Sequence, residues 1–417
     1  MSDRPRVVVT GLGLVSSLGI GRAENWAAAV SGSSGATTIT SFEPLDTATT
    51  IACQVRDFDP TDFMDRRVAR RMDRFAQLAV AAGRMALDDA GLEIDDDLAR
   101  RAGAIVGSGI GGLDTFVEQT LTVDRRGPDR VSPLFIPMVI VNMAAAPVSM
   151  ELGLKGPLSC VSTACASGNH ALGDATEAIR SGRADVMLAG GTEASITRTG
   201  IAAFNAMRAL STRNDDPAAA SRPFEAGRDG FVMGEAGAIL VLESLEHAIA
   251  RGAEPLCEVL GYGLTGDAHH LTEPDPTGSA PAAAIAMALA DAGVEPSEVD
   301  YVNAHATATP IGDKSEIRAL RLALGDEVAE RVMVSSTKSM HGHCLGAAGG
   351  IEGALTALAI HEGVVPPTIN LGDLDPECAG VDHVANEART ADVRVAVSSA
   401  FGFGGHNAIL VFGGMGR

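Results

Sequence analysis

The stretch ALDDAGLEIDD, residues 86–96, has a counterpart in ALADAGVEPSE at residues 288–298. Each is followed within about a dozen residues by a strand that ends in a small-residue loop, as a structural duplication would require. A second pair follows in the same order, EAIRSGRADVML from residue 177 and LAIHEGVVPPTI from residue 358, each with a helix end, a glycine and an extended run. Two similarities in one order predict a structural duplication, with one half over residues 1–251 and the other over residues 252–417.

Apolar runs bounded by glycine alternate with alanine-rich segments along the chain. The runs are RVVVTGLG (6–13), AGAIVGSGIGG (102–112), ADVMLAGGTE (184–193), VDYVNAHATAT (299–309), VMVSSTKS (332–339) and VRVAVSSAFGFGG (393–405). Apolar residues at consecutive positions are typical of strands buried on both faces, whereas the spacing in the alanine-rich segments suits helices. We therefore expect an α/β protein with mixed or parallel sheets covered by helices.

The composition indicates a globular protein of a reducing compartment. With 417 residues, of which 46% are hydrophobic, the chain can bury a large core. No window reaches the roughly 18 apolar residues of a membrane span, and Thr10, Gly11 and Gly13 interrupt the first apolar run, so we expect a cytoplasmic protein without a signal peptide. The cysteines occur singly, without a CxxC pair, and predict neither a disulfide framework nor a metal site. They are Cys53, Cys160, Cys165, Cys257, Cys344 and Cys378.

The net charge of -21 argues against nucleic acid as a partner, because phosphate binding needs a basic surface. A local exception is MDRRVARRMDR, residues 64–74, whose arginines have the spacing of neighbouring turns of a helix. Two interpretations remain open for this segment. It is either a solvated helix face paired with Asp62, Asp65 and Asp73, or a docking surface for a small acidic protein.

The segment VSTACASGNHALGDA, residues 161–175, contains a candidate nucleophile. LSC reads as a strand, the following residues as a tight turn, and NHALGDATEAIR as a helix. A cysteine in such a turn faces free N–H groups and the positive end of the helix dipole, which predicts a lowered pKa for Cys165 and a site for an oxyanion. The alternative is a small buried side chain, because free cysteines are often buried. The small neighbours Ala164, Ala166, Ser167 and Gly168 favour the nucleophile, since they let a substrate approach.

Two histidines follow predicted strands, His305 in VDYVNAHATAT and His343 in VSSTKSMHGHC. Each could be a structural histidine, but open α/β sheets usually place their sites at strand ends. Lys338 precedes His343, and the glycine-rich FGFGG follows another strand. A cysteine with histidines and no zinc spacing indicates acyl transfer through a thioester, which leaves a protease, a thiolase or a condensing enzyme open.

Several long motifs narrow this choice. TACASG, STRNDDPAAASRPFEAGRDGFVMGEAGAIL, NAHATATPIGDKSE, STKSMHGHCLGAAGGIE and SSAFGFGGHN resemble, in order and spacing, the elongating beta-ketoacyl-[acyl carrier protein] synthases, type II, of bacterial fatty acid synthesis. The resemblance runs from VVVTGLG to NAILVFG, nearly the whole chain. It implies a thiolase-like fold with two duplicated halves in a five-layered αβαβα core, and a homodimer.

The resemblance also implies roles for particular residues. Cys165 matches the nucleophile that takes the acyl chain, while His305 and His343 match the pair that drives loss of carbon dioxide from malonyl-carrier. The resulting carbanion attacks the acyl-cysteine and gives a 3-oxoacyl product. The backbone N–H groups of Cys165 and Phe403 match the oxyanion hole.

Further positions match supporting roles in that family. No cofactor is implied beyond the phosphopantetheine arm of the acyl carrier protein, which is the expected partner. The implied electrostatic support comes from Lys338, Glu352 and Asp313, and contacts to the arm come from Thr307, Thr309 and Thr272. The acyl pocket and gate match Ile110, Phe204 and Phe403, and the carrier-docking surface matches Arg66, Arg67, Arg70, Arg71 and Arg208.

Three positions depart from the family pattern. Ala306 stands where the family has glycine, which requires a negative φ there. His341 replaces a threonine and adds a titratable group near the site, and His406 replaces the threonine of GGTN. None of these changes removes a catalytic position.

Four other functions share parts of this pattern. A ketosynthase of a polyketide or other specialised pathway shares the fold and catalytic residues and stays the main alternative. A chain-initiating synthase has asparagine where His343 stands, and a degradative thiolase needs a second cysteine near the C-terminus, whereas Cys378 lies away from FGFGGHN. A non-catalytic chain-length partner would lack the nucleophile.

Overall fold

A computed structural model describes residues 4–43 and 46–416. Residues 1–3 and 44–45 of the predicted first half and residue 417 of the second half lie outside the described residues. Twelve strands form a mixed sheet in the order β13-β11-β10-β15-β16-β9-β1-β8-β7-β5-β6, with β2 beside β1. These strands are β1 (Val7–Ser16), β2 (Gly19–Ile20), β5 (Ala102–Gly107), β6 (Leu158–Val161), β7 (Val186–Glu193), β8 (Ala236–Ser244), β9 (Cys257–Gly266), β10 (Tyr301–Asn303), β11 (Met333–Ser335), β13 (Asp382–His383), β15 (Val395–Gly402) and β16 (His406–Gly413). Two small pairs lie apart, β3 (Thr37–Thr38) with β4 (Ile51–Ala52) and β12 (Val364–Val365) with β14 (Arg389–Thr390).

The strand order repeats between the two parts of the chain. From the middle outward, β1, β8, β7, β5 and β6 on one side correspond to β9, β16, β15, β10 and β11 on the other. Among the strands of the described residues, the two sets pair between β1 and β9, where Val8 pairs with Glu258 and Val9 with Cys257. In each set the outer strands are parallel, as in β5 beside β6 and β10 beside β11, and the inner strands are antiparallel.

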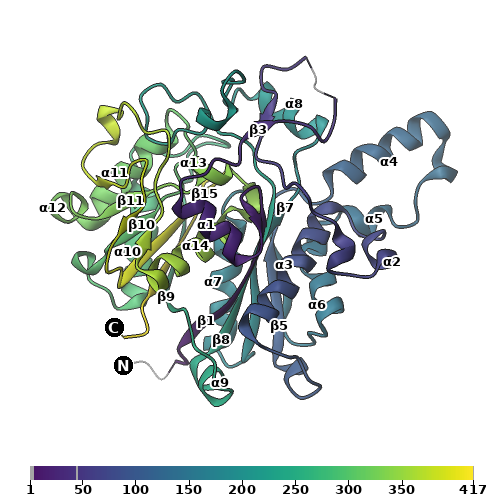
Figure 1. Ribbon diagram of the computed structural model, residues 1–417, viewed down its shortest axis with the longest axis horizontal. Coiled ribbons are helices and arrows are strands. Elements are labelled where there is room, and N and C mark those ends of the chain that lie inside the picture. Colours follow the sequence, from purple (N-terminus) through teal and green to yellow (C-terminus); the bar gives the residue numbers. More distant parts are fainter. Residues whose placement is uncertain (1–3, 44–45, 417) are drawn as a thin grey trace.

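The helices form three layers around these strands (Figure 1). α3 covers β1 and β8 on one outer face, α10 covers β9 and β16 on the other, and α7 and α14 contact strands of both sets and each other. The helices are α1 (Arg22–Val30), α2 (Arg66–Ala69), α3 (Arg74–Ala90), α4 (Leu113–Arg126), α5 (Phe135–Val139), α6 (Ala146–Leu152), α7 (Ser167–Arg180), α8 (Arg198–Ala206), α9 (Leu245–Ala250), α10 (Ser279–Ala292), α11 (Gly312–Leu324), α12 (Asp326–Ala329), α13 (Lys338–His341) and α14 (Ala348–Glu362).

The buried side chains divide in the same way, because successive residues of a strand face opposite sides of a sheet. In β8, Leu240 and Leu242 join the central core with α7 and α14, while Ile239 and Val241 join the outer core under α3. In β16, Leu410 and Phe412 face the central core, whereas Ile409 and Val411 join the outer core under α10. The predicted five-layered, thiolase-like α/β core is confirmed.

The repeated sequence segments occupy corresponding places. The first pair ends α3 and α10, each closed by a glycine in the left-handed region, with φ 56° at Gly91 and 62° at Gly293. The second pair ends α7 and α14, and each helix is followed by a glycine and an extended run, as predicted. The run after α7 is β7 of the main sheet, whereas the run after α14 is β12, and β15 takes the place that corresponds to β7.

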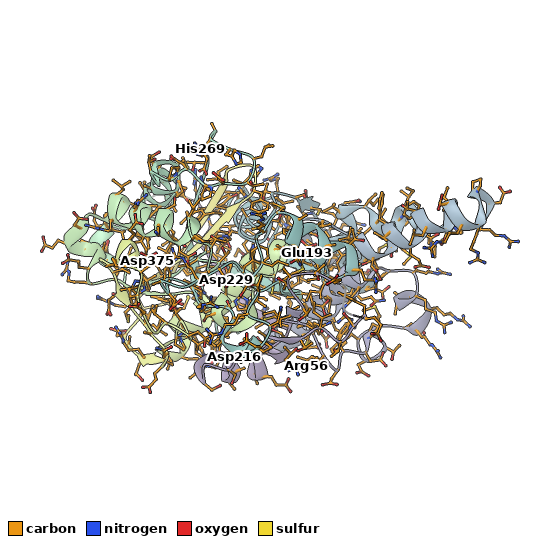
Figure 2. The ribbon with its side chains drawn as sticks, turned by 90° about the horizontal axis from the view of Figure 1, so that it is seen from above. Arg56, Glu193, Asp216, Asp229, His269 and Asp375 are labelled. Carbon is orange, nitrogen blue, oxygen red and sulfur yellow. The ribbon has the colours of Figure 1, made fainter. Side chains whose placement is uncertain are left out.

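Two surface segments differ from the body. Residues 64–74 do not form one helix as expected, because Asp65 caps the short α2 and Asp73 caps a separate α3. α4 extends away from the rest of the chain in two perpendicular views (Figures 1 and 2).

Across residues 4–43 and 46–416, no helix is long and apolar enough to cross a membrane.

Candidate active site

Cys165 lies in the tight turn between β6 and α7, as the sequence predicts. The turn is held by the Ser167 hydroxyl, which donates to the carbonyl oxygen of Ala164 at 2.6 Å and accepts from the N–H of Thr163 at 2.9 Å. Ala164 has φ 50°, an uncommon conformation that is typical of a sharp turn exposing a nucleophile. Gly402 packs directly on this turn, because a β-carbon there would lie 2.4 Å from the carbonyl oxygen of Thr163.

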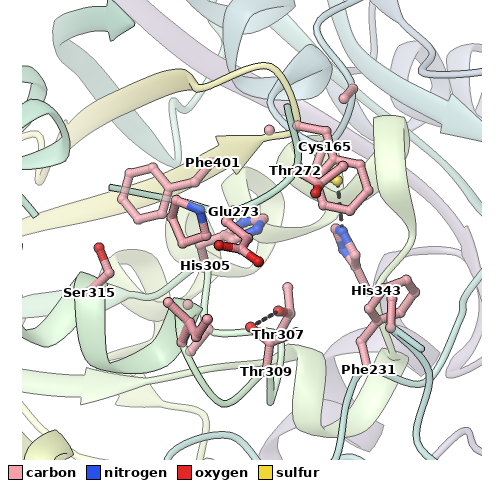
Figure 3. A pocket seen from close by; sticks show the side chains of 18 of the residues that line it. Cys165, Phe231, Thr272, Glu273, His305, Thr307, Thr309, Ser315, His343 and Phe401 are labelled. Atoms are coloured by element: carbon pink, nitrogen blue, oxygen red, sulfur yellow. Dashed lines mark hydrogen bonds between the residues drawn. The ribbon is translucent and has the colours of Figure 1, made fainter. Parts of the chain in front are cut away.

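Both candidate histidines lie next to the cysteine (Figure 3). The Nε2 atom of His343 is 2.9 Å from the Sγ atom of Cys165, and the rings of His305 and His343 are 5.4 Å apart and perpendicular at 89°. His305 follows β10 by two residues. His343 does not follow its strand directly, since α13 lies between β11 and the histidine.

These residues line a cavity of about 520 Å³. Its wall combines apolar side chains with hydroxyl groups and backbone N–H groups, which suits a flexible amide-bearing ligand. The predicted site residues that line it are Cys165, His305, His343, Phe403, Thr307, Thr309, Thr272, Ile110, Phe204 and Arg208. Lys338, Glu352 and Asp313 are buried behind the wall rather than in it.

Burial keeps both histidines neutral. Desolvation lowers the pKa of His305 and of His343 well below the usual range, and the nearby charge of Lys338 lowers both further. Neutral imidazoles can donate or accept one hydrogen bond at Nε2, depending on the tautomer. This agrees with the expectation of uncharged donors beside a thioester.

The expected low pKa of Cys165 is wrong. The residue is 6% exposed, and burial raises the pKa of its thiol to about 12. Lys338 and the N–H groups of Phe403 and Cys165 favour the thiolate, but desolvation outweighs them. The resting site therefore holds a neutral thiol hydrogen-bonded to a neutral imidazole.

The same N–H groups define an anion-binding position. The backbone N–H groups of Phe403 and Cys165 both point at the Cys165 sulfur. A thioester carbonyl on this sulfur would bring its oxygen close to them, which is the arrangement of an oxyanion hole. Gly402 permits this close approach of the β15 end to the cysteine turn.

Lys338 and Glu352 form a buried ion pair behind the histidines, and neither side chain is more than 1% exposed. Burial raises the pKa of Glu352 to about 7, although Lys338 favours the ionised carboxylate. The lysine ammonium acts on the site through its field, because it disfavours protonation of His305, His343 and His341.

The departures from the family pattern fit the site. Ala306 does not have a positive φ, so its methyl group is accommodated. His341 is fully buried, and its Nε2 lies 3.0 Å from the Thr337 hydroxyl. Burial and Lys338 lower the pKa of His341 to about 3, so the expected extra titration near the site does not occur in the neutral range.

Four residues near the cavity were missed by sequence reasoning. Glu316 accepts the N–H groups of His305 at 2.8 Å and Ala306 at 2.7 Å, and burial raises its pKa to about 8. Glu193 accepts the N–H groups of Gly109 and Gly346, and thereby joins the loops that follow β5 and His343. Phe231 packs edge-on against His343, with ring centres 5.1 Å apart. The fourth is Arg228, described below. Glu193 and Phe231 stand out as a charged and an aromatic residue in largely apolar motifs, whereas Glu316 in GDKSEIR and Arg228 in FEAGRDG lie among other charged residues, where the sequence gives no such signal.

The predicted docking arginines occupy two places. Arg208 lines the cavity, whereas α2 and the residues after it carry Arg66, Arg67, Arg70 and Arg71, all exposed. In the described parts of the chain these four form no ion pair, while Arg74 contacts Glu235 at 2.9 Å. Asp65 and Asp73 cap helices rather than pair with these arginines, whose exposure agrees with a solvated surface as well as with a docking surface.

The strand order, the layers and the cysteine–histidine cavity define the class as a thiolase-like ketosynthase. The family described as "Beta-ketoacyl synthase, N-terminal domain" matches residues 4–248, and "Beta-ketoacyl synthase, C-terminal domain" matches residues 256–372. The chain belongs to the beta-ketoacyl synthase family.

Similar proteins cover the whole chain. The chain is 49% identical to a 3-oxoacyl-[acyl-carrier-protein] synthase 2 of Synechocystis sp., over 98% of both chains. A solved beta-ketoacyl synthase from Burkholderia phymatum has a TM-score of 0.91 and 37% identity, covering 99% of this chain and 100% of that one. A ketosynthase solved in complex with its type II PKS acyl-carrier protein has a TM-score of 0.92 and 36% identity, with coverage of 99% and 100%.

Proposed function

We propose that the protein elongates fatty acids by decarboxylating condensation of malonyl-[acyl carrier protein] with an acyl chain held on Cys165. The observation that carries this proposal is the contact of 2.9 Å between the Cys165 sulfur and His343, with His305 beside it in one cavity. The relative at 49% identity is named for this type of reaction.

The first half-reaction loads the enzyme. The Cys165 sulfur attacks the carbonyl carbon of an acyl-carrier thioester, and its proton moves to Nε2 of His343. The bond between the carbonyl carbon and the carrier sulfur then breaks, and the carrier thiolate takes the proton. The N–H groups of Cys165 and Phe403 stabilise the oxyanion of the intermediate.

The second half-reaction forms the carbon–carbon bond. Malonyl-carrier loses its carboxylate as carbon dioxide, and the electron pair passes into an enolate whose oxygen accepts hydrogen bonds from the Nε2–H groups of His305 and His343; for His343 this requires that its proton has moved from Nδ1 to Nε2 after loading. The enolate carbon attacks the acyl carbonyl on Cys165. The carbon–sulfur bond breaks, the Cys165 thiolate takes up a proton from water, and 3-oxoacyl-carrier leaves. Neutral imidazoles suit this step, because a charged ring would favour protonating the carbanion.

The surrounding residues take supporting roles. Lys338 and Glu352 tune the field at the histidines without transferring protons, and Asp313 supports the loop beyond His305. Thr307 and Thr309, whose hydroxyls are 3.3 Å apart, and Thr272 contact the phosphopantetheine arm. The enzyme needs no cofactor of its own, since the carrier brings this arm. Ile110 and Phe204 line the acyl pocket, and Phe403 gates it.

The partner we propose is an acyl carrier protein. The exposed arginines of residues 66–71 and Arg208 offer positive charge on a chain whose net charge is -21. Such a patch attracts and orients an acidic partner. Support also comes from the similar ketosynthase that was solved with its acyl-carrier protein.

We also propose a cytoplasmic homodimer. Within residues 4–43 and 46–416, β6 pairs only with β5, which leaves its other edge without a strand partner, and Leu158 in it is 49% exposed. Phe116 in α4 and Ile136 in α5 are also exposed, at 53% and 59%. Free strand edges with apolar surroundings favour pairing with another chain. A second copy of the chain is the partner we assign to this edge, and a monomeric mass in solution would exclude it.

The main alternative is a ketosynthase of a polyketide pathway. Its support is the fold match to the type II PKS ketosynthase, but that identity is 36% against 49% for the fatty acid relative. A chain-length partner without catalysis is disfavoured because Cys165 and both histidines are present.

One experiment separates these functions. The protein is given malonyl-carrier with acyl-carriers of different chain lengths, and products and enzyme are analysed by mass. We expect saturated medium and long chains to load on Cys165 and return as 3-oxoacyl chains two carbons longer. A requirement for a polyketide intermediate would favour the alternative, and no product with any acyl chain would overturn the proposal.

A further inference from the structure

The motif at residues 211–240 contains a buried arginine with no assigned role. The Arg228 side chain is 1% exposed. Its Nε donates to the carbonyl oxygen of Thr309 at 3.0 Å, and Nη2 donates to that of Pro310 at 2.9 Å. Its Nη1 donates to the carboxylate of Asp375 at 2.9 Å and to the carbonyl of Glu225 at 2.8 Å. Arg228 thus links three distant segments of the chain.

Two of those carbonyls belong to the loop between β10 and α11, which carries Thr307 and Thr309. This loop has no regular structure, so buried side chains bind its backbone instead. Glu316 accepts the N–H groups at its start, and Arg228 holds the carbonyls at its end. Ala308 in the middle has φ 68°, a strained conformation that persists only where the surroundings impose it.

Asp313 also helps to fix the loop between β10 and α11, through its contact with Arg228. Its Oδ2 is 3.4 Å from Nε of Arg228 and accepts the N–H of Phe224 at 2.9 Å. The pKa of this carboxyl is raised by burial to about 6, against the influence of Arg228 and of the N–H groups of Thr309 and Ala308. The charged pair lies behind the loop, out of contact with the cavity.

The residues directly after Arg228 contact both the loop between β10 and α11 and the backbone and ring of His343. The N–H of Gly230 donates to the carbonyl of Ala308 at 3.1 Å, and Phe231 packs on the ring of His343. The N–H of His343 donates to Val232 at 2.7 Å, and its carbonyl accepts from Gly234 at 2.9 Å. One extended segment, residues 228–234, therefore binds both the threonine loop and the histidine that contacts Cys165.

We propose that Arg228 is a positioning residue for carrier-borne thioesters, which fixes the threonine loop at the distance from His343 and Cys165 that the phosphopantetheine arm spans. The inference rests on the proposed function, because it assigns the arm to Thr307 and Thr309. Arg228 touches neither substrate nor the reacting atoms. Its loss displaces the hydroxyls that orient the arm, and leaves the cysteine–histidine contact in place.

The test compares Arg228→Lys with the wild-type protein. Lysine keeps the positive charge for Asp375 and Asp313, but it cannot direct separate donors at two neighbouring carbonyls. Loading of Cys165 from acyl-carrier, which needs the arm, is measured by mass at several carrier concentrations. Alkylation of Cys165 by iodoacetamide, which needs no arm, is measured in parallel.

We expect KM for acyl-carrier to rise about tenfold, because one or two hydrogen bonds to the arm are lost. The kcat and the alkylation rate are expected to stay within about twofold of the wild-type values. The matched control is Arg180→Lys. Arg180 is 9% exposed and contacts Asp291 and the carbonyls of Val259 and Leu260, away from the cavity. This control is expected to leave KM unchanged.

Three results would overturn the inference. They are an unchanged KM in Arg228→Lys, an equal fall of loading and alkylation, and the same KM change in Arg180→Lys. A failure of the proposed function is a different result, because the wild-type protein would then form no 3-oxoacyl product at all.

Discussion

The protonation state of Cys165 leads to a quantitative prediction. The thiol is 6% exposed, hydrogen-bonded to a histidine that is itself neutral, and burial raises its pKa to about 12. At pH 7 such a thiol is ionised in about one molecule in 10⁵, against about one in thirty for an ordinary cysteine. Alkylation requires the thiolate, so its rate is expected to rise about tenfold per pH unit between pH 7 and 10, without a plateau.

The assay is alkylation with iodoacetamide at a series of pH values, followed by peptide mass analysis that separates Cys165 from the other cysteines. The same protein unfolded in urea is the control, and its Cys165 is expected to level off above about pH 9. A plateau at or below about pH 8.5 in the folded protein would refute the reasoning. It would mean that the helix end and the N–H groups of Cys165 and Phe403 outweigh desolvation.

Three other predictions concern the docking surface, the nucleophile turn and the cavity wall. The double change Arg66→Glu and Arg70→Glu is expected to weaken carrier binding about tenfold at low salt and much less at high salt; equal affinity at low salt in a titration would contradict it. Gly402→Ala places a β-carbon 2.4 Å from a carbonyl oxygen of the turn and is expected to abolish acyl loading, whereas Gly372→Ala, with nothing within 4 Å, retains it. Phe231→Ala is expected to cost about 3–5 kcal/mol in urea unfolding, and a loss below about 1 kcal/mol would show that the wall is loosely packed.

Much of the fold could be predicted because it is encoded by local patterns. All six glycine-bounded apolar runs contain strands of the main sheet, and both helix pairs that suggested duplication end at glycines in corresponding places. The expectation that most arginines of residues 64–74 lie on neighbouring turns of a helix failed, because Asp65 and Asp73 each cap a separate helix.

The candidate site was predictable as a set of residues, whereas its electrostatics were not. Cys165, His305 and His343 lie near strand ends or turns, and each belongs to a recognisable sequence motif. The pKa of the cysteine depends on burial by segments from the whole chain, which sequence alone does not show. Glu193, Glu316 and Arg228 were missed for a similar reason, since they bind backbone groups of loops that lie from ten to more than one hundred residues away in the sequence.

The central claim is that Cys165 holds the acyl chain while the histidine pair drives decarboxylation, and Cys165→Ala tests it most directly. The variant is incubated with acyl-carrier and malonyl-carrier, and acyl-enzyme, carbon dioxide and products are measured together. The account predicts no acyl-enzyme and no 3-oxoacyl product, with continued release of carbon dioxide from malonyl-carrier. Acylation of the variant enzyme, or a loss of decarboxylation that matches the loss of condensation in a folded protein, would contradict it.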